Sequence, residues 1–185
     1  MSNGLLADLP RMVSVDIESA GPNPADYALL SIGACTLLEP RARFYVELQP
    51  DKASTDAQAM QVHGLDMRVL EKHGLLPAPA LQRLEYWLAE TISDPRGALF
   101  VGFNAAFDWM FLNDYCLHYL GSNPFGHSAI DIKSFAMGLK RSAWEETRMA
   151  QLNNKPLRHN ALEDAEDQAD IFLDLLRAAG ILKAD

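Results

Sequence analysis

Cysteine, long apolar runs and positive charge are all scarce in this sequence. Its two cysteines, Cys35 in a strand-like run and Cys116 in a helix-like run, are interpreted as buried apolar side chains rather than as a disulfide or a metal pair. No apolar run approaches the roughly 20 residues that span a bilayer, and the chain does not open with a basic region followed by an apolar one. We therefore expect a soluble, cytoplasmic protein with no membrane partner.

The shortage of positive charge narrows the choice of ligand. The chain has 16 Lys and Arg against 25 Asp and Glu, a formal net charge of −9. This balance argues against an extended basic surface that holds many phosphates of duplex nucleic acid. It does not exclude an enzyme that acts on nucleic acid, because bound divalent ions would offset several acids gathered in one site. Such an enzyme would touch only a few nucleotides near its metal ions.

The hydrophobic pattern predicts an α/β fold. Strands are expected over residues 12–18, 29–38, 43–48, 98–103 and 129–132. Helices are expected over residues 79–92, 105–120, 134–139 and 143–152 and along a stripe from Leu162 to Leu176. A meander followed by alternating helices and strands predicts one mixed five-stranded sheet with helices on both faces. The length of 185 residues suits a single domain, expected over residues 1–185 with a core of about 12–178.

Acidic residues recur where the buried elements begin or end. Asp16 and Glu18 share one face of the first strand, Asp108 lies in the first turn of a helix, and Asp164 begins the last helix. Side chains beyond strand ends form the usual active site of an α/β protein. Hard cations such as Mg²⁺ and Mn²⁺ prefer carboxylate oxygens, and two ions need several carboxylates. The sequence therefore predicts a two-ion site, where His159 can deprotonate a water molecule.

Each of these residues has an ordinary interpretation when it is taken alone. In a chain with 25 acidic residues, an Asp-x-Glu pair on a strand usually faces solvent. Asp108 is favoured at the positive end of a helix, and a lone histidine before a helix is usually a surface or capping residue. Asp164 adjoins acids that we interpret as one solvated face, namely Glu163, Glu166, Asp167, Asp170 and Asp174. The conjunction of the acids and His159 in this order is what favours a catalytic site.

Three segments resemble the motifs of the DEDDh 3′–5′ exonucleases, a family that includes the proofreading subunits of bacterial replicative polymerases, RNase T and oligoribonuclease. Asp16-Ile17-Glu18 resembles the first motif. The run FNAAFDWMFL from Phe103 to Leu112 resembles the second, and His159-x-Ala161-x-x-Asp164-Ala165 resembles the third. The resemblance covers about residues 13–176 and implies a ribonuclease H-like fold.

The same resemblance implies an activity and a role for each motif residue. It implies a metal-dependent exonuclease that releases nucleoside 5′-monophosphates from a free 3′ end of single-stranded DNA or RNA. Two ions, Mg²⁺ or Mn²⁺, are the expected cofactors. The implied metal ligands are Asp16, Glu18, Asp108 and Asp164, and the implied general base is His159.

Substrate contacts also follow from the resemblance. His63 lies in an apolar-His-Gly segment that resembles a turn near the terminal nucleotide, although a turn histidine without a ligand is an equal alternative. Ser19 and Ala20 stand where the family commonly has two threonines, so backbone amides there can hold the terminal sugar. With Asn104 of the second motif, these are the predicted substrate-binding residues. Asp131 is interpreted as structural, and the choice between DNA and RNA stays open.

Aromatic residues are dense in the expected middle helix. We expect Phe107 and Phe111 to lie in the core, Trp109 and Tyr115 to project elsewhere, and most of these rings to pack rather than to stack on bases. Phe103 is likewise expected to pack.

Oligomeric state and rival functions stay open. The chain is expected to be a monomer or a homodimer, with Trp144 either at an interface between copies or in the core. The rival functions are a catalytically silent nucleic-acid-binding module, a polymerase-associated proofreading or accessory subunit, and an endonuclease of the same fold.

Overall fold

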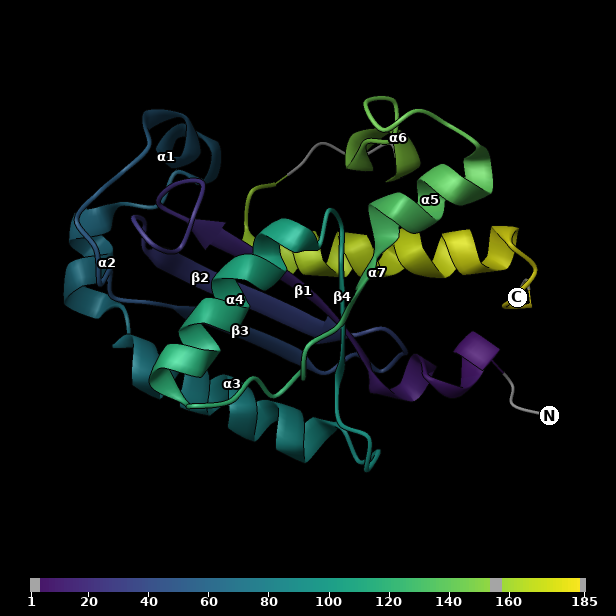
Figure 1. The fold of residues 1–185 in the computed structure, drawn as a ribbon, viewed down its shortest axis with the longest axis horizontal. Coiled ribbons are helices and arrows are strands. Elements are labelled where there is room, and N and C mark those ends of the chain that lie inside the picture. Colours follow the sequence, from purple (N-terminus) through teal and green to yellow (C-terminus); the bar gives the residue numbers. More distant parts are fainter. Residues whose placement is uncertain (1–3, 154–157, 184–185) are drawn as a thin grey trace.

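A mixed sheet of five strands lies at the centre of the molecule, in the order β3-β2-β1-β4-β5 (Figure 1). A computed structural model of the chain describes residues 4–153 and 158–183. The strands are β1 Met12–Ser19, β2 Leu29–Thr36, β3 Arg43–Glu47, β4 Leu99–Gly102 and β5 Ala129–Asp131. β2 is antiparallel to β1 and β3, whereas β4 is parallel to β1 and β5. The prediction of a mixed five-stranded sheet is confirmed.

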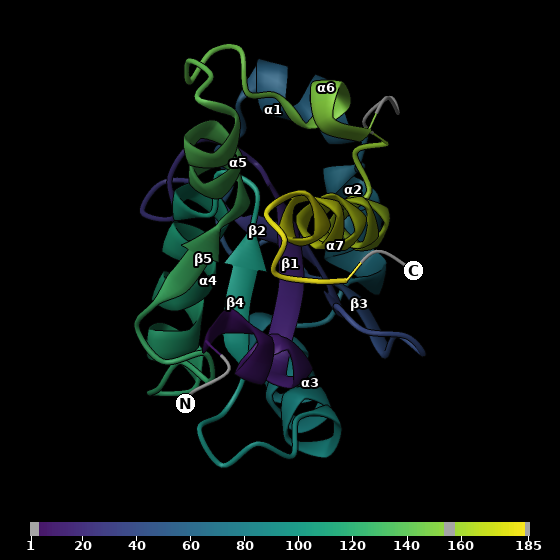
Figure 2. The ribbon, with the colours of Figure 1, turned by 90° about the vertical axis from the view of Figure 1, so that its right-hand side faces the viewer.

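Helices cover both faces of this sheet. They are α1 Ala57–His63, α2 Met67–His73, α3 Pro77–Thr91, α4 Ala106–Tyr119, α5 Ile132–Lys140, α6 Met149–Asn153 and α7 Ala161–Ala178, with short 3-10 turns at Gly4–Ala7 and Leu9–Arg11. α3 and α4 pack on the face that carries Val13 and Val15, and α5 and α7 pack on the face that carries Met12 and Val101. Figure 2 looks along the axis of α7, which lies against β1 and β2.

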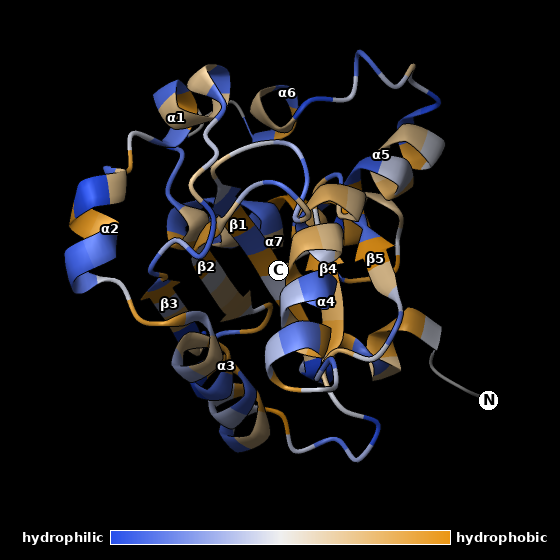
Figure 3. Cartoon of the chain, turned by 60° about the vertical axis from the view of Figure 1, so that its left-hand side comes forward, coloured by the Kyte–Doolittle hydropathy of each residue, from blue (hydrophilic) through white to orange (hydrophobic). Residues whose placement is uncertain are grey.

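The alternation of β1 explains this two-sided burial, because successive side chains of a strand point to opposite faces. Figure 3 shows β4 as hydrophobic and α2 at the edge of the molecule as largely hydrophilic. Cys35 and Cys116 are buried free cysteines in different core clusters, so their prediction as buried apolar side chains is confirmed. Among residues 4–153 and 158–183, every helix is too short or too polar to traverse a lipid bilayer.

Two short helices, α1 and α2, were not expected from the sequence. Each begins at a capping aspartate: the Asp56 carboxylate accepts from the Ala59 amide at 2.9 Å, and Asp66 accepts from Arg68 at 2.8 Å. α1 ends at Gly64, whose φ of 68° suits glycine. These helices depend on their caps and have little apolar periodicity, so the spacing of their apolar residues does not predict a helix.

The helix expected over residues 143–152 is shorter than predicted. Only α6, Met149–Asn153, is helical, and a turn precedes it. In that turn the Glu146 carboxylate accepts from the Ala143 amide at 3.3 Å, and the Thr147 hydroxyl donates to the Ala143 carbonyl at 2.9 Å. Polar side chains that bond to nearby backbone groups compete in this way with regular helix.

Candidate active site

Three acidic side chains meet at the carboxyl end of β1. Asp16 and Glu18 project from the same face of β1, and Asp164 comes from the first turn of α7. One carboxylate oxygen of each lies within 4.8 Å of the others. The Asn160 side chain starts α7 here by accepting from the amides of Leu162 and Glu163. Hard oxygen donors at this spacing can bind a divalent cation.

Asp108 supports this group from α4. It is buried in the first turn of that helix, and its Oδ1 accepts from the Ile17 amide at 3.1 Å, between Asp16 and Glu18. Asp108 is not one of the three residues whose oxygens lie within 4.8 Å of one another, but it lines the same cavity.

The electrostatics of the site favour a bound cation. Burial, reinforced by the charges of Asp164 and Asp108, raises the pKa of Glu18 to about 8. Burial raises the pKa of Asp108 to about 7 and also raises that of Asp164. The pKa of Asp16 is raised by burial and then by the three neighbouring carboxylates. Such shifts arise when negative charges are desolvated close together, and a divalent cation would reverse them. The residues therefore fit a divalent metal.

A cavity of about 420 Å³ joins the predicted catalytic residues. Its lining includes all four carboxylates, His159 and Asn104. His159 and Asn104 both have left-handed backbone, with φ of 53° and 59°. Non-glycine residues seldom adopt this region and are enriched at functional sites when they do.

A second cavity, also of about 420 Å³, adjoins the first and shares Ile17, Glu18 and Phe107 with it. Ser19 and His63 line this second cavity. The Ser19 hydroxyl donates to the Gly21 carbonyl at 2.8 Å. Phe107, expected in the core, is only half-buried and stands between the two cavities, whereas Phe111 is fully buried.

His63 and Ala20 differ in their access to this cavity. His63 Nδ1 accepts from the Leu65 amide at 3.0 Å, while its buried Nε2 has no partner among residues 4–153 and 158–183. Burial lowers the pKa of His63, so the neutral ring is favoured. Ala20 is fully buried beside Leu30, and its amide donates to the Ala28 carbonyl at 2.8 Å. Ala20 does not line the cavity, and its backbone donor is already used.

Gln168 is a site residue that the sequence reasoning missed. It is 1% exposed, its Nε2 donates to Asp16 Oδ1 at 2.6 Å, and its Oε1 accepts from the Phe103 amide at 2.9 Å. The side chain thus ties the acid of β1 to the backbone that follows β4. Its signal was available, because Gln168 lies four residues after Asp164 and interrupts the apolar stripe of the last helix.

Asp131 is structural, as expected. Its carboxylate caps α5 by accepting from the Ser134 amide at 2.6 Å and also accepts from the Ala105 amide at 2.7 Å. It therefore fixes the turn that carries Asn104. Phe103 packs against the core cluster beneath α5 and α7 and also lines the first cavity.

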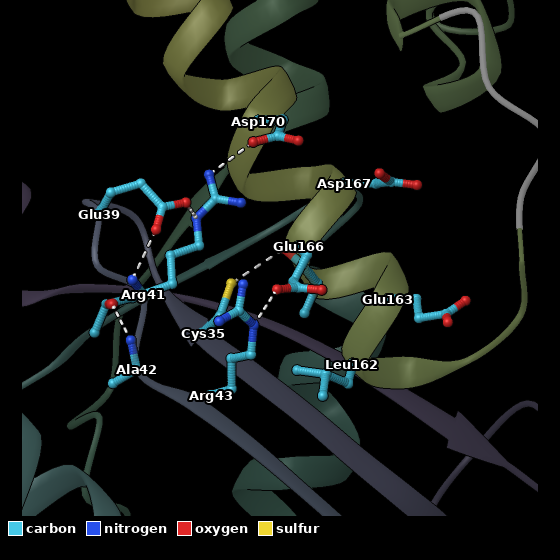
Figure 4. A network of polar contacts seen from close by, with 12 residues as sticks. Cys35, Glu39, Arg41, Ala42, Arg43, Leu162, Glu163, Glu166, Asp167 and Asp170 are labelled. Carbon is cyan, nitrogen blue, oxygen red and sulfur yellow. Dashed lines mark hydrogen bonds and ion pairs between the residues drawn. The ribbon is translucent and has the colours of Figure 1, made fainter.

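The expected solvated acidic face of the last helix is only partly correct. Asp167 is 3% exposed and lies 3.5 Å from the Arg158 guanidinium, so that prediction is wrong for Asp167. On another side of α7, Arg43 pairs with Glu166 and Arg41 with Asp170, as Figure 4 shows. These pairs hold α7 to the start of β3 and to the connection that precedes it.

The prediction that Tyr115 projects away from the core is wrong. Tyr115 is fully buried in the core, and its hydroxyl accepts from the Leu29 amide at 2.9 Å. The buried hydroxyl also contacts the Asp51 carboxylate. Tyrosine can be buried when its hydroxyl finds such partners. Trp109 is partly buried, edge-on to Phe100.

A ribonuclease H-like sheet with four carboxylates at the carboxyl end of β1 fits a nuclease that uses divalent metal, and sequence comparison gives the family. Residues 13–172 match the RNase T family, described as exonuclease, and the chain belongs to this family of DEDDh 3′–5′ exonucleases. It is 42% identical over 165 residues to the 3′-5′ DNA exonuclease Cap18 of Escherichia coli, covering 86% of this chain and 88% of the relative. It is 30% identical to ribonuclease T of Vibrio vulnificus (strain CMCP6), covering 86% and 81%.

A solved structure shows the same fold at low sequence identity. The nuclease domain of 3′hExo, a DEDDh family member bound to rAMP, superposes with a TM-score of 0.76 at 14% identity, covering 94% of this chain and 95% of that domain. The expected ribonuclease H-like fold and 3′–5′ exonuclease class are confirmed.

Proposed function

We propose that this exonuclease removes nucleoside 5′-monophosphates one at a time from the 3′ end of single-stranded DNA. The observation that carries the reaction is the group of Asp16, Glu18 and Asp164 oxygens within 4.8 Å of one another, beside buried Asp108. DNA is supported by the relative named a DNA exonuclease at 42% identity, against 28% and 30% for those named ribonuclease T. Single-stranded RNA is the second candidate.

The four carboxylates would hold two ions, Mg²⁺ or Mn²⁺. When bound, such ions supply stabilisation of the negative charge that develops on the phosphate and on the leaving oxygen. The carboxylates themselves are held by the protein: Gln168 fixes Asp16, and the Ile17 amide fixes Asp108. Preorganised ligands of this kind cost little reorganisation during the reaction.

His159 is the proposed general base. It lines the same cavity as the carboxylates and precedes Asn160, the N-cap of α7. It would take a proton from the attacking water, whose oxygen forms a bond to phosphorus while the bond to the 3′ oxygen of the preceding nucleotide breaks. The products are a nucleoside 5′-monophosphate and a strand shortened by one nucleotide.

The test is a time course on 5′-labelled single-stranded DNA and RNA of the same sequence, with Mg²⁺, Mn²⁺ or EDTA. We expect a metal-dependent ladder that shortens from the 3′ end, faster on DNA. Asp164→Ala should abolish turnover, and His159→Ala should lower kcat roughly 10²–10⁴-fold while substrate still binds. Asp174→Ala on the exposed side of α7 is the matched control and should keep the wild-type rate. Wild-type turnover by Asp164→Ala would contradict the proposed site.

The same assay separates the rival functions. A silent binding module would bind the oligomer and leave it uncut, and an accessory subunit would cut only when a polymerase partner is added. An endonuclease would cleave a circular single strand, which an exonuclease leaves intact.

We also propose that residues 1–185 form one exonuclease domain with a core of about 12–178, and that the protein is cytoplasmic and a monomer or homodimer. The two core clusters, which share one sheet, support the single domain. One cooperative unfolding transition is the expected result for the domain, and sedimentation distinguishes monomer from homodimer.

A further inference from the structure

Positive charge in this acidic chain is concentrated beside the site. Residues 132–153 hold four basic residues against two acidic ones, in a chain whose net charge is −9. These residues comprise α5, the turn after it and α6, and are called here the α5–α6 segment. Figure 1 shows α5 and α6 on one side of the end of β1 and α1 on the other.

Two of these basic side chains reach the catalytic cavity. Lys133 of α5 and Arg148 just before α6 line it together with Asp16, Asp164 and His159. Neither forms an ion pair with another residue of the described ranges, 4–153 and 158–183. Arg148 Nε donates to the Glu145 carbonyl at 3.0 Å, which leaves its charge uncompensated. Cations without an acidic partner that face the cavity of a phosphodiesterase can bind phosphates of its substrate.

An exposed aromatic ring completes this surface. The Lys133 ammonium lies 3.8 Å from the centre of the Trp144 ring, and Trp144 is 41% exposed. A cation over an indole face is attracted by the ring and is held in place. Basic groups interleaved with an aromatic platform are the combination that binds single strands, through phosphate contacts and base stacking.

The neighbouring cavity indicates which part of the strand lies here. Among the described residues that line it, which include Ser19, Asp56 and His63, none is lysine or arginine. A 3′-terminal nucleotide brings only the scissile phosphate, so a cavity without lysine or arginine suits its sugar and base. Every nucleotide further toward the 5′ end adds a phosphate that needs a cation.

We propose that the α5–α6 segment is the track for the strand on the 5′ side of the scissile phosphate, where Lys133 and Arg148 each bind one phosphate and Trp144 stacks on a base. This inference rests on the proposed function and adds the residues that hold the substrate. For single strands, the logarithm of affinity falls with the logarithm of salt concentration by about 0.7 for each neutralised phosphate. One such contact is therefore worth about fourfold in Kd at roughly 0.15 M salt.

The test measures binding and small-substrate turnover separately. Binding of a labelled single-stranded DNA 12-mer is followed by fluorescence anisotropy in an Asp164→Asn background, which prevents cleavage. Lys133→Gln or Arg148→Gln should each weaken Kd about fourfold at 0.15 M salt and lower the salt slope by about 0.7, and the double variant about 15-fold. Arg83→Gln removes the same charge from the exposed side of α3, away from the site, and should change neither.

The small substrate is the p-nitrophenyl ester of thymidine 5′-monophosphate, which has no nucleotide on the 5′ side. With Asp164 intact, both glutamine variants should hydrolyse it within twofold of the wild-type rate. If the variants lost as large a factor in hydrolysis of the ester as in affinity for the 12-mer, Lys133 and Arg148 would lie at the reacting phosphate and the proposed track would be wrong. An unchanged Kd and salt slope in the double variant would also contradict the track. Failure of the wild type to hydrolyse ester or DNA would contradict the proposed function. The anisotropy measurement would still show whether the α5–α6 segment binds the strand.

A separate variant tests whether Trp144 stacks on a base. Trp144→Leu should weaken binding of the 12-mer several-fold without changing the salt slope, because stacking carries no charge. If this variant instead left Kd unchanged and dissociated a dimer in sedimentation, Trp144 would lie at an interface between copies and its part in the track would be wrong.

Discussion

Gln168 joins the acid of β1 to the backbone that follows β4 by two hydrogen bonds of 2.6 and 2.9 Å. Gln168→Leu removes both bonds and leaves the Phe103 amide unpaired, which should lower the free energy of unfolding by about 1–3 kcal/mol. Because partners of metal ligands orient those ligands, kcat should fall roughly 10- to 100-fold and half-maximal rate should need more Mg²⁺. Melting curves and metal titrations of the rate check this, with the exposed Gln82→Leu as control. A stability loss without any change in the metal titration would make Gln168 merely structural.

Only some of the residues at the site could be predicted from the sequence, and Gln168 is one that could not. Asp16, Glu18 and Asp164 could be grouped in advance, because strand alternation and the start of a helix fix where their side chains point. Gln168 and Asp167 could not be assigned so simply, since a polar residue on a helix is exposed or buried according to which partner lies opposite. Asp16 lies on β1, 152 residues away from Gln168, and Arg158 lies in the segment that leads into α7.

At the scale of elements, the close approach of α7 to β2 depends on Gly33. Gly33 pairs with Asp16 across the β1–β2 ladder. A Cβ atom on Gly33 would lie 2.1 Å from the carbonyl carbon of Ala161 and from the nitrogen of Leu162, which are backbone atoms of the first turn of α7. The glycine therefore lets the helix start directly over the sheet and brings Asp164 to Asp16.

Gly33→Ala should displace the start of α7 or unfold the protein, because backbone atoms cannot move aside as a flexible side chain does. We expect a loss of about 1–3 kcal/mol or more in the free energy of unfolding, together with loss of exonuclease activity. Denaturant titration and the labelled-DNA assay measure the two. Gly138→Ala in α5 is the control: nothing lies within 4 Å of its Cβ, and alanine should stabilise that helix by up to about 1 kcal/mol. A Gly33→Ala protein as stable and active as wild type would contradict this account.

Most elements could be predicted from hydrophobic periodicity, and the exceptions share a cause. The sheet strands and the long helices α3, α4 and α7 bury regular apolar stripes, which a sequence displays directly. α1 and α2 are short and begin at capping aspartates, and the turn before α6 is held by side-chain contacts to its own backbone. Local hydrogen bonds of this kind leave only a weak periodic signal.

At the scale of the whole molecule, the acid cluster should make stability depend on pH and on metal. Burial raises the pKa of Glu18 from its ordinary 4.5 to about 8, and that of Asp108 from 3.8 to about 7. A carboxyl with a raised pKa in the folded state favours folding when it is protonated. That contribution is complete below the ordinary pKa and is lost as pH rises through the folded-state value. In EDTA, the melting temperature should therefore fall between about pH 5 and pH 8.

A bound divalent cation should reverse this trend, since it stabilises the ionised carboxylates and binds only the folded site. With Mg²⁺ or Mn²⁺ in excess, we expect a higher melting temperature at pH 8 and a flatter dependence on pH. The double variant Glu18→Gln, Asp108→Asn tests the origin of the slope, because it keeps the shape of both side chains and removes both titrations. It should melt higher than wild type at pH 8 in EDTA and respond little to metal. If the variant kept the wild-type slope in EDTA, the pH dependence would arise from the overall negative charge of the chain rather than from the acids at the carboxyl end of β1.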